Sequence, residues 1–163
     1  MKCCRAMNSK PLEVPASLWQ ALIDDLRQRG FGKRESGAFL LGTMDGDIRR
    51  VQAWVPYDEL DANALSAGYV RLDTSAFARL WAICIEKSLT VVADVHTHPY
   101  GPGQSHSDRA NPMISQAGHF ALIVPNFACG RVAPVDVSVN VYLGSKQWAS
   151  FFKRDAQALI RLT

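Results

Sequence analysis

The chain contains 163 residues, of which 48% are hydrophobic and 20% are charged. This length and composition are typical of one globular domain with a single core, and they exclude collagen-like, disordered and small disulfide-rich proteins. The chain is also shorter than the roughly 200 residues that a (β/α)8 barrel needs.

The formal net charge of +3 comes from basic residues that are scattered in pairs, such as Lys33-Arg34 and Arg49-Arg50. Because there is no basic tract, we expect no nucleic-acid partner. No apolar stretch reaches the roughly 18 residues of a transmembrane helix, so we expect no membrane partner. Residues 1–14 lack the apolar core of a secretory signal, and we therefore expect the protein in the cytoplasm.

Apolar periodicity and turn residues predict a mixture of helices and strands. In chain order we expect a helix over 15–29, strands over 36–43 and 50–55, a loop over 58–67, a strand over 69–72, a helix over 75–87, a strand over 89–95, a short helix over 111–118, strands over 120–124, 137–143 and 148–152, and a helix over 154–162.

Turn and cap residues separate these elements. Ser17 and Gln20 are expected to form a capping box on the first helix, with Pro15 as an alternative start. Asp45-Gly46 and Gly144-Ser145 are expected to form hairpin turns. The pattern predicts an α/β or α+β fold in which helices flank a mixed, mainly antiparallel sheet. We expect a flexible N-terminus over residues 1–10 and a single domain over 11–163.

The four cysteines form no paired CxxC motif, so a structural zinc knuckle is not expected. Cys3 and Cys4 are adjacent near the N-terminus and are expected to be free thiols. Cys84 falls on the apolar side of a predicted helix and is expected to be a small core residue.

The segment Asp94-Val95-His96-Thr97-His98-Pro99 carries the clearest chemistry. Side chains alternate across a strand, so His96 and His98 project from the same face with Cα atoms about 6.5–7 Å apart. Two imidazoles at this spacing can hold one metal ion at the end of the strand. The turn Gly101-Pro102-Gly103 can return Asp108 as a third ligand, which leaves a fourth tetrahedral position for water, as in catalytic zinc sites.

Each of these residues also has a simpler interpretation. An HxH pair is common without a metal, and Ser105 and Asp108 suit a turn or a helix cap. His106 is expected in an exposed loop, and it is the first substitute if Asp108 does not bind the metal. His119 follows a glycine at a strand start, where we expect a structural role. Glu35 follows two basic residues and on composition alone is a solvated residue at a strand start.

Other enzymes with an HxH motif fit less well. Amidohydrolase-type barrels and polymerase-associated phosphoesterases need more histidine ligands and a longer chain, whereas this chain has four histidines. The metallo-β-lactamase pattern needs Asp and His soon after the pair, but Pro99-Tyr100-Gly101 follow it here.

Two motifs together resemble the JAMM (MPN+) metalloproteases, which include the prokaryotic JAB and the eukaryotic deubiquitinase peptidases. One is His96-Thr97-His98-Pro99 with Ser105-His106-Ser107-Asp108, and the other is the run from Glu35 to Gly42. The resemblance covers about residues 11–150 and implies a JAB/MPN-like fold. The family usually has ten residues between the second histidine and the aspartate, whereas nine separate His98 from Asp108. Ala38 stands where the family often has glycine.

The resemblance also implies a site and a mechanism. One zinc ion per chain would be bound by His96, His98 and Asp108. Glu35 would act as the general base that takes a proton from water and passes it to the leaving amine. Ser105, together with the zinc ion, would stabilise the oxyanion of the tetrahedral intermediate.

The substrate class follows from the resemblance alone. Members of the family cleave after the C-terminal glycine of ubiquitin or ubiquitin-like proteins, in deconjugation or in precursor processing. Bacterial members accompany homologues of activating and conjugating enzymes, often in antiphage defence loci. We therefore expect a ubiquitin-like modifier and its conjugates as partners. The alternatives are a peptidase of sulfur-carrier proteins in cysteine or thio-cofactor metabolism, a non-catalytic MPN scaffold and a metal-binding regulator.

Overall fold

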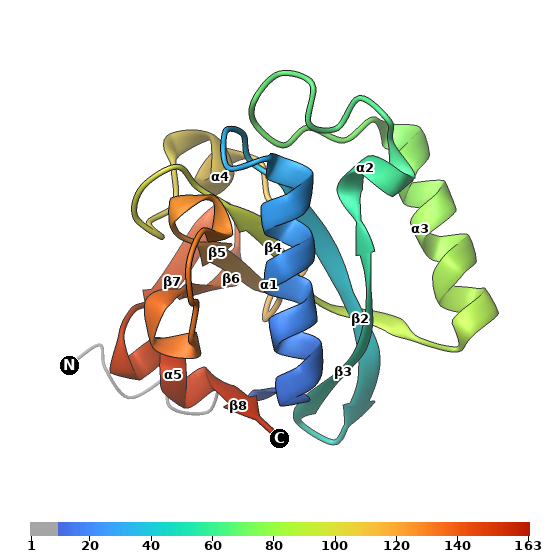
Figure 1. The fold of residues 1–163 in the computed structure, drawn as a ribbon. Helices are drawn as coiled ribbons and strands as arrows, with labels where there is room; N and C mark the ends of the chain where they lie inside the picture. The colour runs from blue at the N-terminus through green and yellow to red at the C-terminus, as the bar shows by residue number, and fades with distance from the viewer. Residues whose placement is uncertain (1–9) are drawn as a thin grey trace.

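The computed structural model describes residues 10–163, and its centre is one curved sheet (Figure 1). Within the described residues the sheet has eight strands in the order β7-β6-β5-β4-β2-β3-β1-β8. The strands are β1 (Leu12–Val14), β2 (Gly37–Asp45), β3 (Ile48–Pro56), β4 (Thr90–Thr97), β5 (Phe120–Val124), β6 (Ser138–Gly144), β7 (Gln147–Phe151) and β8 (Ile160–Leu162).

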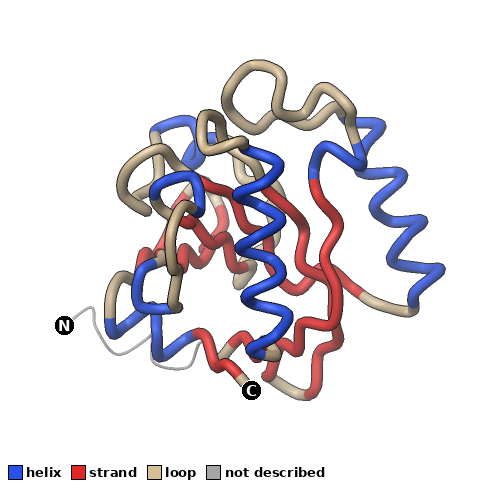
Figure 2. Tube along the Cα trace, viewed as in Figure 1, coloured by secondary structure: helices blue, strands red, loops and turns tan. Residues whose placement is uncertain are grey.

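Helices cover both faces of this sheet (Figure 2). They are α1 (Ala16–Gly30), α2 (Tyr57–Leu60), α3 (Thr74–Lys87), α4 (His106–Ala110) and α5 (Arg154–Leu159), with short 3-10 turns η2 (Asn126–Ala128) and η3 (Pro134–Asp136). The long helices α1 and α3 lie on opposite sides of β2 and β3 (Figure 1). The pairs β4–β5, β1–β3 and β1–β8 are parallel and the other four are antiparallel. The predicted class, a mixed and mainly antiparallel sheet flanked by helices, is confirmed.

Strand β2 is apolar on both faces because it separates two cores. Ala38 and Leu40 pack into the core beneath α1, whereas Phe39 and Leu41 pack into the core beneath α3. This alternation follows from the two-residue period of a strand. Full burial of each large apolar side chain contributes roughly 1.5–3 kcal/mol to the free energy of unfolding. β2 is therefore firmly held between the two cores, and the residues at its ends have well-defined positions.

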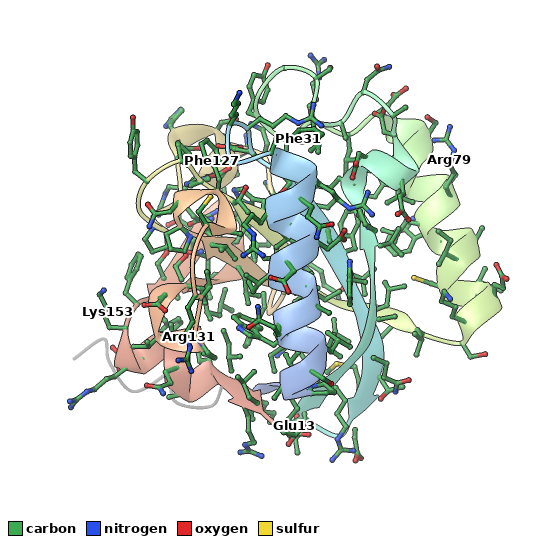
Figure 3. All side chains as sticks on the ribbon, in the orientation of Figure 1. Glu13, Phe31, Arg79, Phe127, Arg131 and Lys153 are labelled. Carbon is green, nitrogen blue, oxygen red and sulfur yellow. The ribbon has the colours of Figure 1, made fainter. Side chains whose placement is uncertain are left out.

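The two long helices are held by their apolar faces and by a few polar contacts. On α1, Trp19, Leu22 and Leu26 are buried, and the indole of Trp19 donates a hydrogen bond to the Val132 carbonyl at 2.9 Å. On α3, Arg79 (labelled in Figure 3) donates to the Leu60 carbonyl at 2.6 Å and so ties α3 to α2. The predicted helices over 15–29 and 75–87 are confirmed within one residue at each end.

Two local predictions are wrong, and a third holds only in part. Helix α1 has Pro15 as its N-cap and no side-chain cap, so the capping box of Ser17 and Gln20 does not form and the alternative start at Pro15 is the better prediction. Residues 69–72 form no strand, and the predicted loop over 58–67 is confirmed over 61–67, whereas 58–60 belong to the short helix α2. These errors lie where propensity is weak and tertiary contacts decide the conformation.

The third predicted helix, over 111–118, is also misplaced. The short helix lies just before it, as α4, and Asn111 is its C-cap. Reciprocal capping by Ser105 and Asp108 stabilises the upstream turn more than an Asn-Pro start stabilises the downstream one.

The predicted C-terminal helix, over 154–162, ends at Leu159. Residues Ile160–Leu162 instead pair with β1 as strand β8. β1 itself is three residues long and gave no detectable signal in the sequence.

Two further predictions are only partly covered by the structure. Cys84 is buried as expected, and Cys129 is exposed. Cys3, Cys4 and the flexible N-terminus predicted over residues 1–10 lie outside the described residues, except for Lys10. Among residues 10–163, no helix is both long and apolar enough to span a membrane.

Candidate metal centre

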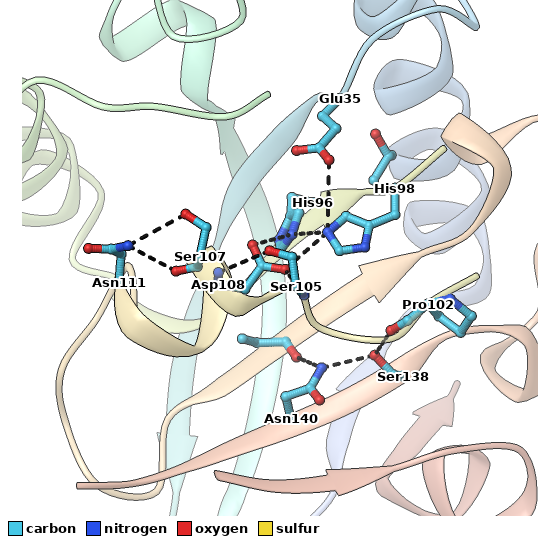
Figure 4. Close-up of polar contacts among 12 residues, drawn as sticks. Glu35, His96, His98, Pro102, Ser105, Ser107, Asp108, Asn111, Ser138 and Asn140 are labelled. Atoms are coloured by element: carbon cyan, nitrogen blue, oxygen red, sulfur yellow. Dashed lines mark hydrogen bonds and ion pairs between the residues drawn. The ribbon is translucent and has the colours of Figure 1, made fainter. Parts of the chain in front are cut away.

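The site lies where β4 ends. Alternation along the strand places His96 and His98 on one face, as the sequence predicted, and their Nε2 atoms lie 2.9 Å apart (Figure 4). Each side chain is about 10% exposed. The two rings therefore converge on one point at the edge of the sheet, and both can still be reached from solvent.

The backbone around His98 is fixed although it lies beyond the last strand residue. Its N–H donates to the Val124 carbonyl at 2.9 Å, and its carbonyl accepts from Phe127 N–H at 2.8 Å. Phe127 belongs to the turn η2, whose three residues Asn126–Ala128 have φ angles between 51° and 60°. Left-handed conformations of this kind persist in non-glycine residues only where the surrounding structure imposes them. The turn thus holds the second histidine in place.

Glu35 reaches the site because β2 starts beside the end of β4. Ser36 N–H donates to Thr97 Oγ1 at 3.0 Å, and Thr97 N–H donates to the Ser36 carbonyl at 2.9 Å. Gly37 pairs with His96, and a Cβ atom at Gly37 would lie 2.4 Å from the ring of Tyr57. The small residues after Glu35 therefore permit this close approach, and 61 positions of sequence separation are closed by strand pairing.

Asp108 comes from the first turn of α4, which is closed by a capping box. Asp108 N–H donates to Ser105 Oγ at 3.1 Å, and Ser105 N–H donates to Asp108 Oδ2 at 2.7 Å. The same carboxylate faces both rings, with Oδ1 3.3 Å from His96 Nε2 and Oδ2 3.1 Å from His98 Nε2. The helix-cap role that Ser105 and Asp108 suit is thus realised, and the cap aims the carboxylate at the histidines.

We call His96, His98 and Asp108 the His–Asp cluster. Tetrahedral zinc with ligands at about 2.0–2.1 Å places neighbouring ligand atoms roughly 3.3 Å apart. The distances of 2.9, 3.1 and 3.3 Å within the cluster are close to this value. Two imidazole nitrogens and one carboxylate are also a donor set that suits zinc, so the residues fit a zinc ion.

Glu35 lies near this cluster but farther from the histidines than Asp108. The ligand atoms of Glu35, His96 and His98 all lie within 4.8 Å of one another, so these three residues can also hold a metal ion. Glu35 Oε1 is 3.9 Å from His98 Nε2, whereas the Asp108 oxygens are 3.1 and 3.3 Å from the two rings. These distances favour Asp108 as the third ligand. They leave space for about one water molecule between the Glu35 carboxylate and the His–Asp cluster.

Charge pairing dominates the electrostatics of the cluster. Burial alone would lower the pKa of His96, but the hydrogen bond and charge of Asp108 outweigh it and raise that pKa. Burial alone would raise the pKa of Asp108, but hydrogen bonds from His96 and His98 hold it well below its usual range. The carboxylate is therefore ionised at neutral pH, as a metal ligand must be.

A cavity of about 650 Å³ opens beside the cluster, and Glu35, His96, Ser105 and Asp108 all line it. His106 is exposed on α4 and makes none of the hydrogen bonds of the cluster. All five residues singled out in the sequence, Glu35, His96, His98, Ser105 and Asp108, are thus brought together at one end of β4 and β2.

A second polar group on the same strand was not predicted from the sequence. Asp94 also lines the cavity, and its Oδ2 lies 2.6 Å from His119 Nε2. The signal was present, because a carboxylate within an apolar strand and two residues before His96 must share the face of His96. The structural role expected for His119 agrees with its buried contact to Asp94.

Comparison with known proteins gives one family. A family model described as prokaryotic homologs of the JAB domain matches residues 15–127. The match spans more than half of the chain and contains every residue of the cluster together with Glu35 and Ser105.

Solved structures show the same fold. A protein from Desulfitobacterium hafniense has a TM-score of 0.65 and 16% sequence identity, with 93% of this chain and 92% of that chain covered. A protein from Salinibacter ruber has a TM-score of 0.59 and 16% identity, with 91% and 90% covered. At this level of identity, the likeness concerns the fold alone.

Proposed function

Because this chain belongs to the prokaryotic homologs of the JAB domain, a family that includes metallopeptidases, we propose that it is a zinc-dependent peptidase. The observation that carries the proposal is the convergence of His96, His98 and Asp108 within 3.3 Å of one another, with Glu35 beside them. A scaffold without catalytic function would not need this donor set at a cavity wall.

In this proposal His96, His98 and Asp108 hold one zinc ion. Bound zinc polarises a carbonyl and lowers the pKa of water to about 7. Glu35 takes the proton of the attacking water and gives it to the leaving amine, for which its position about one water from the cluster is suitable. The Thr97–Ser36 hydrogen bonds keep this base in register with the ligands.

Ser105 is proposed to stabilise the oxyanion that forms at the substrate carbonyl. Its Oγ accepts the hydrogen bond from Asp108 N–H, and it donates no hydrogen bond within residues 10–163. The hydroxyl proton is therefore free for the substrate. One such donor typically contributes a factor of about 10²–10³ in rate, so Ser105 combines a cap and an oxyanion contact.

We propose that the substrate is a ubiquitin-like protein cleaved after its C-terminal glycine, in deconjugation or precursor processing. The family resemblance supports this class, and the recessed position of the two histidines favours a slim Gly-Gly tail. Activating- and conjugating-enzyme homologues and an antiphage defence context are proposed on the resemblance alone.

The test combines metal content with cleavage. The zinc-loaded full chain is incubated with two fusions that end in Gly-Gly before a reporter, one a ubiquitin-like protein and one a sulfur-carrier protein. Products are identified by intact mass. We expect about one zinc per chain and cleavage of the ubiquitin-like fusion. Preferential cleavage of the carrier fusion would instead support the sulfur-carrier alternative.

Glu35→Gln separates catalysis from metal binding. We expect this variant to keep its zinc and to lose turnover by about 10²–10⁴-fold, the usual contribution of a general base. Glu86→Gln, an exposed position on α3 outside the cavity, is the matched control and should retain wild-type activity. Absence of bound zinc in the wild type would overturn the proposal in favour of a scaffold.

A further inference from the structure

The segment that brings Asp108 and Ser105 to the histidines has little structure of its own that fixes its position. We call residues 101–110 the return segment, which ends in the five-residue helix α4. Helices this short are marginal in isolation and depend on tertiary contacts. Gly101 and Gly103 are exposed, and a Cβ atom at either position would meet no atom within 4 Å. Other elements must therefore fix the position of the return segment.

Strand β6 provides one contact, from a buried serine to a loop carbonyl. Ser138 is fully buried, and its Oγ donates a hydrogen bond to the Pro102 carbonyl at 2.6 Å (Figure 4). Within residues 10–163 this is the only hydrogen bond that residues 101–104 form. The first part of the return segment is thus tied to the sheet by one hydroxyl group.

Strand register places this serine in line with a proposed metal ligand. His96 of β4 pairs with Ile123 of β5, and Ile123 pairs with Ser138 of β6. Since paired residues project to the same face of a sheet, Ser138 and His96 share one face, two strands or about 10 Å apart. The return segment spans this distance, with Pro102 against β6 and Asp108 against His96.

Asn140 sets the direction of the serine hydroxyl. Its Nδ2 donates to Ser138 Oγ at 2.9 Å and to the Ala121 carbonyl at 3.1 Å. Because a carbonyl only accepts, the amide nitrogen faces Ala121, and both of its protons are used. Ser138 Oγ thus accepts from Asn140 and donates its single proton to Pro102. The hydrogen bonds run without a break from β5 through β6 to the return segment.

Stability alone does not account for Asn140. Its side chain is fully buried, and its Oδ1 has no hydrogen-bond partner among residues 10–163. An unpaired buried acceptor lowers the free energy of unfolding, whereas Val139 and Val141 on the other face of β6 add to the core. The polar side chain is better explained by the geometry that it imposes on Ser138.

Strand β7 provides a second contact, after the capping box. The indole Nε1 of Trp148 donates to the Arg109 carbonyl at 3.0 Å, and its ring packs edge-to-face on Tyr142 of β6, with centroids 4.9 Å apart. The β6–β7 hairpin therefore holds the return segment on both sides of Ser105 and Asp108. Both strands begin beyond residue 127, where the family match ends.

We propose that the β6–β7 hairpin positions the metal ligand Asp108 and the oxyanion contact Ser105. Ser138 and Trp148 are its positioning residues, and Asn140 orients Ser138. The inference rests on the proposed function for the statement that Asp108 binds zinc and Ser105 contacts the substrate. Ser138 and Asn140 are not among the residues that line the cavity, so they act through the return segment. Outer contacts of this kind typically contribute a factor of about 10–100 in metal affinity or activity.

Backbone order parameters of the zinc-free full chain test the inference without metal or substrate. For the N–H groups of Gln104 and Ser105 we expect values of about 0.85 in the wild type, as in rigid backbone, and below about 0.6 in Ser138→Ala. Ser138→Thr keeps the hydroxyl and should retain the wild-type values. The matched control is Ser66→Ala, which removes another hydroxyl that donates to a carbonyl, that of Asn63 at 2.8 Å, and should change neither value.

Equal order parameters in the wild type and Ser138→Ala would overturn the inference, as would values below about 0.6 in the wild type. If Ser138→Ala does not fold, Trp148→Phe carries the test, because it keeps an aromatic ring against Tyr142 and removes the N–H donor. The order parameter of Ala110 should then fall below about 0.6, and an unchanged value would overturn the inference.

Zinc affinity shows whether the effect reaches the metal through Asp108. The dissociation constant is measured by competition with a chromophoric chelator. We expect Ser138→Ala to weaken zinc binding about tenfold in the otherwise wild-type chain. In Asp108→Asn, where the positioned ligand is absent, the same change should weaken binding by less than about twofold. Equal weakening in both backgrounds would overturn the inference, because a general loss of stability does not depend on Asp108.

The outcome is independent of the peptidase test. Absence of zinc from the wild type would overturn the proposed function, while the order parameters would still decide whether the hairpin holds the return segment. Zinc binding and cleavage, with no change in order parameters in Ser138→Ala, would retain the proposed function and overturn this inference.

Discussion

Two groups that each combine histidine and carboxylate side chains are built on strand β4, and they differ in the number of ligand atoms that face one point. In the His–Asp cluster, two imidazole nitrogens and a carboxylate face one another at 2.9–3.3 Å at the strand end. Two residues earlier, Asp94 and His119 form one short contact of 2.6 Å in the interior. Several ligand atoms that face one point can bind a metal ion. The single Asp94–His119 contact instead acts as a structural anchor, by which we mean a contact that joins β4 to the start of β5.

The neighbouring strand explains part of this difference. Across the β2–β4 ladder, Gly37 lies opposite His96, and Phe39 lies opposite Asp94. The glycine leaves room for the Tyr57 ring, whereas Phe39 packs into the core beneath α3. The same strand pair therefore carries an accessible site at one end and the buried Asp94–His119 contact two residues away.

The largest expected effect is a difference in zinc content between two variants, each of which removes one histidine from one of the two groups. His98→Ala should lose stoichiometric zinc, because only two ligand atoms of the His–Asp cluster then remain. His119→Ala should retain about one zinc per chain, because its ring contacts Asp94 and no ligand. Zinc is measured by mass spectrometry after gel filtration. Equal zinc content in the two variants would contradict the distinction between a metal centre and an anchor.

Gly37→Ala tests the space that the accessible site requires. The added Cβ would lie 2.4 Å from the Tyr57 ring and 2.7 Å from the Val95 carbonyl oxygen. Overpacking of this kind costs about 1–3 kcal/mol in the free energy of unfolding, measured by urea denaturation. Gly101→Ala is the matched control, since a Cβ there meets no atom within 4 Å. A Gly37→Ala variant as stable as this control would show that β2 and β4 can separate freely.

Much of the site follows from sequence patterns. The common face of His96 and His98 follows from strand alternation, and the resemblance to JAMM proteases linked them to Glu35. The position of α4 did not follow from the Asn111-Pro112 signal, because the reciprocal cap of Ser105 and Asp108 and the contacts of Asp108 with the two rings favour the upstream turn. The Asp94–His119 contact joins a residue of β4 to the residue just before the parallel strand β5, and no local pattern specifies such a contact.

Ser105→Ala has a smaller expected effect on stability than Gly37→Ala, and it separates the cap from the oxyanion contact. Loss of the cap should cost about 1 kcal/mol in stability, while the zinc content should stay near that of the wild type. Turnover should fall by about 10²–10³-fold if Ser105 donates to the substrate oxyanion. Ser75→Ala, at an exposed position in the first turn of α3, is the control. Wild-type turnover with reduced stability would leave Ser105 with the capping role alone.

The smallest effect concerns the acid stability of the zinc-free protein. Despite burial, the histidine contacts lower the pKa of Asp108 below the unfolded value of about 3.9. A lowered folded-state pKa contributes stability that is present above about pH 4 and is lost as the pH falls through the folded-state value. The raised pKa of His96 contributes stability below about pH 6.5 that is lost as the pH rises through its folded-state value. Asp108→Asn removes the shifted carboxyl group itself and the largest of the contacts that raise the pKa of His96, while Asp94 and Glu35 remain. The free energy of unfolding should therefore vary less with pH between about 3 and 8 than in the wild type. Urea denaturation at a series of pH values measures this, and parallel curves would mean that the His–Asp cluster is not charge-paired before zinc binds.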